Sequence, residues 1–104
     1  MARRIVGQCS TSDFKYLEYL ADVLRDGGEI DMTNLTNRQK IAVRVLKHFQ
    51  DCGTNFSVLL KIREVLVWQY DGGGYAFEYK LLNPRDIDTR NILRGMKEVR
   101  NGRT

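Results

Sequence analysis

Three cationic side chains recur at helical spacing in the middle of the chain. Lys40, Arg44 and Lys47 lie at positions i, i+4 and i+7, so a helix places them within about 60° of one another. The residues that point the other way are apolar: Ala42, Val45, Leu46 and Phe49. Such a row of cations can hold the phosphates of a nucleic acid, and the alternative is an ordinary solvated helix surface.

A second cationic row lies near the C-terminus, where Arg90, Arg94 and Lys97 repeat the helical spacing. Two such rows in a small protein could follow a phosphate backbone, each contact adding a salt-sensitive share of the affinity. Any readout of bases is expected from the segment around Asn55, Ser57 and Lys61. We therefore expect nucleic-acid contacts from Arg38, Lys40, Arg44, Lys47, Lys61, Arg63, Arg90, Arg94 and Lys97.

Aromatic residues cluster in the segment that follows the first cationic row. Their positions are Trp68, Tyr70, Tyr75, Phe77 and Tyr79. Exposed rings could stack on unpaired bases, whereas buried rings would form the core of a small sheet. We expect burial for Trp68 and Phe77, because so short a chain has few other large core residues, and a stacking role stays open for Tyr75 and Tyr79.

Residues that could perform catalysis are scattered. His48 is the sole histidine, is expected at the helix surface, and could activate at most one of the two cysteines, Cys9 and Cys52. No cluster has the spacing of metal ligands, and no Gly-Lys-Ser/Thr follows the glycines at 72–74 as a phosphate-binding loop requires. The sequence therefore predicts a protein that is not an enzyme and needs no cofactor.

The N-terminal third differs from the rest in charge. Residues 1–33 hold four basic and six acidic side chains, although the whole 104-residue chain carries a net charge of +4. Tyr16 and Tyr19 fall outside the apolar stripe of the acidic helix predicted there. Exposed tyrosines suit a protein interface, so a homodimer or a larger protein partner could bind at this pair, unless both rings pack along the rim of the core.

Composition narrows the class of protein. The chain is 42% hydrophobic, which is enough for one core, and it has no apolar run of the about 20 residues that a membrane helix needs. Two cysteines are too few for a secreted disulfide framework. We expect a cytoplasmic protein with reduced thiols and no membrane partner.

The elements that must position these residues follow from periodicity and turn signals. Helices are expected over 13–25, from a capping box at Thr36 to Gly53, and after Asp86 or Asp88. A short extended piece is expected over 29–32, and a hairpin with its reversal at 71–74. Residues 56–66 read as a short helix turning into a strand, although the pattern leaves helix or strand open.

This order resembles that of a winged helix-turn-helix with an added C-terminal helix. A plain α+β domain, with helices packed against a hairpin in the C-terminal half, fits the same elements. We expect one domain over 1–104, with residues 1–9 and 101–104 frayed. The functional hypothesis is a DNA-binding regulator, with DNA favoured over RNA; the alternative is a protein-interaction module, for instance a small viral or accessory inhibitor of a larger protein.

Overall fold

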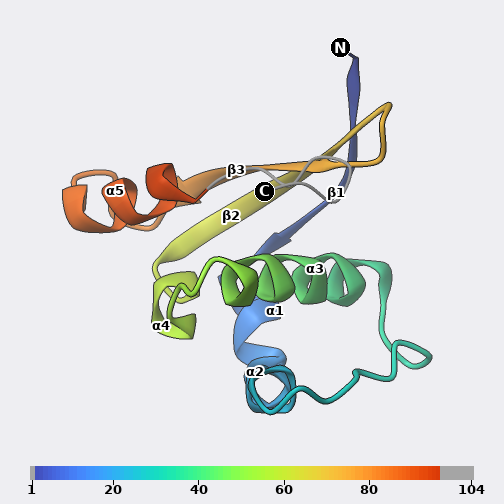
Figure 1. Cartoon of the computed structure of the whole chain (residues 1–104). Coiled ribbons are helices and arrows are strands. Elements are labelled where there is room, and N and C mark those ends of the chain that lie inside the picture. Colours follow the sequence, from blue (N-terminus) through green and yellow to red (C-terminus); the bar gives the residue numbers. More distant parts are fainter. Residues whose placement is uncertain (1, 97–104) are drawn as a thin grey trace.

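A computed structural model of the chain describes residues 2–96 (Figure 1). In this range the chain forms a small α+β domain, as expected from the sequence. Its elements in chain order are β1 (Arg3–Ser10), α1 (Thr11–Tyr16), α2 (Glu18–Arg25), α3 (Asn37–Asp51), α4 (Phe56–Leu59), β2 (Ile62–Tyr70), β3 (Tyr75–Leu81) and α5 (Ile87–Gly95).

The three strands form one antiparallel sheet in the order β1-β2-β3. Strand β1 pairs with β2 from Arg3 opposite Tyr70 to Ser10 opposite Glu64. Strand β3 pairs with the other side of β2 through the predicted hairpin, whose turn contains Gly73 at a φ of 95°. Glycine reaches this left-handed region without a steric penalty, so the turn is tight.

Helices α1 to α4 lie on one side of the sheet, and Figure 1 shows α3 running across it. Residues from these helices, from the facing side of the strands and from α5 form the core. Its buried members are Cys9, Phe14, Leu17, Leu20, Ala42, Val43, Val45, Leu46, Phe49, Val58, Leu59, Ile62, Val65, Val67 and Leu93.

Helix α3 begins as the capping box predicts. The Thr36 hydroxyl accepts a hydrogen bond from the Gln39 amide at 3.2 Å, and the Gln39 side chain accepts one from the Thr36 amide at 2.8 Å. These bonds satisfy two amides that a helix start would otherwise leave unpaired. The helix ends near Gly53, which takes a φ of 70°.

The expected helix over 13–25 is two helices instead. The amide of Leu17 lies 3.1 Å from the carbonyl oxygens of both Asp13 and Phe14, and this irregular turn separates α1 from α2. Figure 1 shows the two helix axes pointing in different directions. Leu17 itself is fully buried, so the break occurs at a residue that is anchored in the core.

The expected order of elements is wrong at two places near the N-terminus. Residues 1–9 were expected to fray, yet β1 covers Arg3–Ser10. Residues 29–32 were expected to form a short extended piece between two helices, yet they form no strand. Because β1 and β3 occupy both sides of β2, the central strand has no free edge for residues 29–32. The winged-helix order is therefore not reproduced.

The sequence leaves open whether residues 56–66 form a helix or a strand, and the structure contains both. Helix α4 covers Phe56–Leu59 and begins at Asn55, whose side chain accepts from the Ser57 amide at 2.9 Å. Strand β2 then begins at Ile62, so the change from helix to strand falls within the predicted range. The β-branched residues that follow suit the half-buried centre of a sheet.

The C-terminal helix begins at the expected place. The Asp86 carboxylate accepts from the Thr89 amide at 3.1 Å and from the Thr89 hydroxyl at 2.7 Å. Both bonds favour the ionised form and lower the pKa of Asp86 below its usual value. Helix α5 follows from this cap, and the expected continuation beyond Met96, like the frayed tail over 101–104, lies outside the described residues.

Candidate nucleic-acid interface

A groove lies between α5 and the outer strand β3. Its cavity measures about 630 Å³. The described side chains that line it are His48, Arg63, Phe77, Glu78, Tyr79, Lys80, Leu81, Pro84, Arg90, Leu93, Arg94 and Met96. Four of these residues are cationic, against a single carboxylate among the described residues of the lining, so the groove suits an anionic ligand.

Helix α5 supplies two of the four cations. Arg90 and Arg94 are one helical turn apart and both are exposed. The Arg90 guanidinium also donates a hydrogen bond to the Pro84 carbonyl, which holds this side chain beside the turn that joins β3 to α5. The Asp86 cap fixes the start of the helix, so the turn residues set the position of both arginines.

The third cation, Arg63, lies at an irregularity of the sheet. The pairing of β2 with β3 shifts register between Ile62 and Glu64. Such a bulge bends the strand and redirects a side chain, and Arg63 accordingly lines the groove. Three cations predicted from the sequence, Arg63, Arg90 and Arg94, are thus brought together from β2 and α5.

Lys80 and Glu78 also line the groove, but each has a partner. The Lys80 ammonium lies 3.6 Å from the Glu64 carboxylate, and Trp68 donates to Glu78 at 3.0 Å. Trp68 is only half-buried, on the sheet side away from α3, although the sequence favoured its burial. Lys80 was not among the predicted site residues. Its place next to Tyr79 in the alternating strand is the signal in the sequence that could have indicated it.

The floor of the groove is aromatic. His48 of α3 stacks on Phe77 with ring centroids 4.3 Å apart, and Phe77 and Tyr79 are near-parallel at 6.5 Å. His48 was expected at the helix surface and is instead 5% exposed. Burial lowers the pKa of His48, and the more weakly acting Asp51 opposes this shift. Its ring is therefore neutral near pH 7 and adds no charge to the floor.

The remaining α3 cations lie beside the groove rather than within it. The Arg44 guanidinium covers the Tyr75 ring at 4.1 Å, at the end of β3 nearest the hairpin turn. Lys40 and Lys47 are exposed on the outer side of the helix. Because Arg44 contacts the first residue of β3 and α5 lies beyond the last, basic groups flank this strand at both ends.

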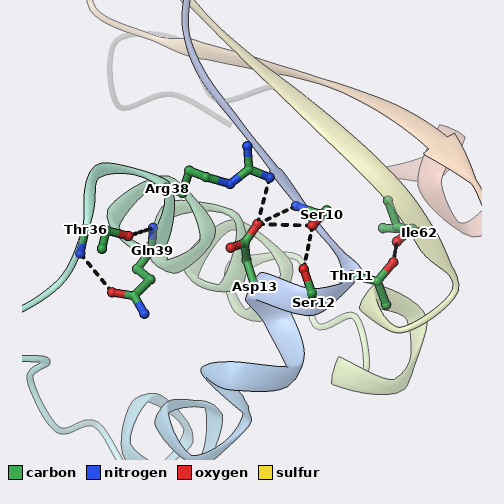
Figure 2. A network of polar contacts seen from close by, with 8 residues as sticks. All are labelled: Ser10, Thr11, Ser12, Asp13, Thr36, Arg38, Gln39 and Ile62. Carbon is green, nitrogen blue, oxygen red and sulfur yellow. Dashed lines mark hydrogen bonds and ion pairs between the residues drawn. The ribbon is translucent and has the colours of Figure 1, made fainter.

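Arg38 has a structural contact. Its guanidinium lies 3.1 Å from the Asp13 carboxylate, which also accepts from the amide of Ser10 at 2.8 Å and from its hydroxyl at 3.2 Å (Figure 2). Figure 2 shows this carboxylate joining β1, α1 and the first turn of α3, close to the Thr36–Gln39 cap. Arg38 therefore ties three elements together.

The other predicted basic residues lie apart from this network. Lys61 is exposed just before β2, where its carbonyl accepts from the Leu82 amide at 3.0 Å. Lys97 lies outside the described residues. Two cations that the sequence analysis left aside lie on β1: Arg3 covers the Trp68 ring at 4.4 Å, and Arg4 donates to Gln69 at 3.5 Å.

The predicted partner residues are well exposed. Tyr16 retains 64% of its accessible surface and Tyr19 retains 61%, so neither ring packs along the rim of the core. Two exposed rings on neighbouring short helices offer apolar area to a partner.

Groups suited to other chemistry are sparse in the part of the chain that the structure describes. Within residues 2–96, no three His, Cys, Asp or Glu side chains lie close enough to hold a metal ion. The Cys52 sulfur lies 4.0 Å from both ring nitrogens of His48. Burial and the Asp13 charge raise the pKa of the Cys9 thiol to about 12, so Cys9 stays protonated. No described helix is long and apolar enough to cross a membrane.

Comparison of the chain with protein families, with curated proteins and with solved structures found no match.

Proposed function

We propose that this chain is a small non-enzymatic nucleic-acid-binding protein of the cytoplasm, with DNA favoured over RNA, and that it acts as a regulator. The observation that carries the proposal is the meeting of Arg63, Arg90 and Arg94 at one groove. Guanidinium groups hold phosphate oxygens in paired hydrogen bonds, and neutralised phosphates release bound counterions.

The positions of the basic residues support a contact that extends beyond the groove. Arg44 lies at one end of β3 and the α5 arginines at the other, so one strand of nucleic acid could contact both. The hairpin turn at 71–74 carries no cation, so binding is assigned to the cations of β2, α3 and α5 and not to that turn.

The test is a binding titration by fluorescence anisotropy with duplex DNA, single-stranded DNA and RNA at about 50 and about 200 mM salt. The double variant R90Q/R94Q removes two groove cations. We expect weaker binding and a salt slope smaller by about 2, because each arginine that is replaced leaves one phosphate without a neutralising cation.

The matched control is K15Q/R25Q, which removes the same charge from α1 and α2, away from the groove. Its affinity and salt slope should remain close to those of the parent chain. Unchanged binding by a folded R90Q/R94Q protein would contradict the role of α5.

The row of cations on α3 needs its own variant. The triple change K40Q/R44Q/K47Q should also weaken binding and flatten the salt dependence if α3 contacts the same strand. An unchanged slope in this folded variant would restrict the interface to the groove.

The alternative function is a protein-interaction module, such as a small viral or accessory inhibitor of a larger protein, or a homodimer. The exposure of Tyr16 and Tyr19 on the acidic N-terminal third favours it. Binding by such a surface would change little with salt, whereas binding to phosphates would fall steeply. Light scattering of the parent and of Y16S/Y19S would show whether these rings hold two copies together.

A further inference from the structure

The groove combines cationic side chains with aromatic rings, whereas the backbone of a duplex needs only the cations. Exposed arginines from β2 and α5 line it, and its floor holds the rings of His48, Phe77 and Tyr79. Phosphate contacts to a duplex come from cationic and polar side chains, backbone amides and helix N-termini, and they do not require aromatic rings. The rings therefore point to a further part of the ligand.

The rings are arranged in advance of any ligand. The planes of His48 and Phe77 differ by 17°, and those of Phe77 and Tyr79 by 16°. Phe49 meets the Tyr79 ring edge-on at 5.9 Å from the core side, so Tyr79 is held from behind. Rings that are already fixed lose little conformational freedom when a flat ligand stacks on them.

The size of the groove also favours a flat unit over a double helix. A cavity of about 630 Å³ is in the usual range of sites that enclose a small organic ligand. In a duplex the faces of the bases are stacked on one another and cannot contact a protein ring. In a single strand each base presents a free face, which is what aromatic side chains bind.

We infer that the groove takes unpaired nucleobases of a single strand, with a base against the Phe77 and Tyr79 rings and the adjoining phosphates on Arg63, Arg90 and Arg94. The inference rests on the proposed function and narrows it to single-stranded nucleic acid. The apolar Leu81 and Leu93 complete the lining beside the rings, which suits a base better than a second phosphate.

The experiment compares three labelled probes that carry the same number of phosphates: a single strand of DNA with all its bases, an abasic strand, and a duplex. We expect the base-bearing strand to bind about five- to a hundredfold more tightly than the abasic strand, the effect of stacking one base. Equal binding of base-bearing and abasic strands, or tighter binding of the duplex, would overturn the inference while leaving the proposed function intact. No salt-sensitive binding of any probe would overturn both.

A variant locates the effect in the groove. F77L keeps most of the apolar volume of a half-buried residue and removes its ring, so it should lower affinity for the base-bearing strand and leave the abasic strand unchanged. The control is F56L, which changes a half-buried ring on α4, outside the groove. Circular dichroism of each variant checks that it is folded. A base-bearing strand that binds F77L as tightly as the parent would overturn the assignment to these rings, and an RNA strand of the same sequence shows whether the sugar matters.

Discussion

A tight contact between β1 and α3 allows a quantitative prediction for G7A. A Cβ at position 7 would lie 2.6 Å from Cγ1 and 2.8 Å from Cδ1 of Ile41, whereas ordinary contact is 3.4–4 Å. Isoleucine in a helix is confined to one main χ1 rotamer, so Ile41 cannot easily turn away and α3 must shift. Overpacking of this kind lowers the free energy of unfolding by about 1–3 kcal/mol. Alanine suits a strand better than glycine, which offsets up to about 1 kcal/mol of this loss. The midpoints of these ranges give a net loss of about 1 kcal/mol.

The assay is urea unfolding followed by circular dichroism, in which stability changes move the midpoint without altering the slope. The double variant G7A/I41A provides the control, because only Cβ of residue 41 remains, at 3.6 Å from the new methyl group. The two changes should together cost at least about 1 kcal/mol less than the sum of the single changes. Additive costs, or a G7A protein as stable as the parent, would refute the proposed contact.

Three further predictions concern a helix cap, a buried imidazole and the two thiols. T36A removes the acceptor of the Gln39 amide and should lower the free energy of unfolding by about 1 kcal/mol. Urea unfolding measures this change, and an unchanged midpoint would mean that the cap contributes nothing to stability. Burial lowers the pKa of His48 below 6.5, so the unfolded chain binds the proton more readily and stability falls as the pH drops through 6.5. The urea midpoint should therefore be lower at about pH 5.5 than at about pH 7.5, and an equal difference in H48Q would contradict this origin. The exposed Cys52 should react with a thiol reagent in the folded chain, whereas the buried Cys9 should react only in denaturant; rapid reaction of both thiols would show that β1 opens readily.

Elements with a local cause could be predicted from the sequence. The capping box at Thr36, the glycines at 72–74 and the Asp86 cap act over a few residues, and the structure contains α3, the hairpin and α5 where these signals place them. Strand β1 gives no comparable signal. It contains Gly7 on its core side, and its pairing partner lies on β2, far along the chain, so no pattern within β1 reveals its role.

The candidate site divides in the same way. The spacing of Arg90 and Arg94 predicts that they share a face of one helix, and the structure confirms this. Their meeting with Arg63 depends on the register shift in β2 and on the turn at Pro84, and neither is encoded in periodicity. The use of Arg38 to hold Asp13 across 25 positions was likewise beyond a helical-wheel argument.

The pairing of β1 with β2 has a consequence for the order of events during synthesis. Strand β1 leaves the ribosome before β2, and about 50 further residues must follow before β2 is available to it, which takes about 3–10 s at usual rates of translation. Helices α1 to α4 emerge in that interval and can form from local contacts, whereas β1 then has no strand to pair with. The nascent chain therefore exposes an unpaired strand until β2 is made, and a pause in translation before Ile62 would prolong the period in which β1 can associate with another chain.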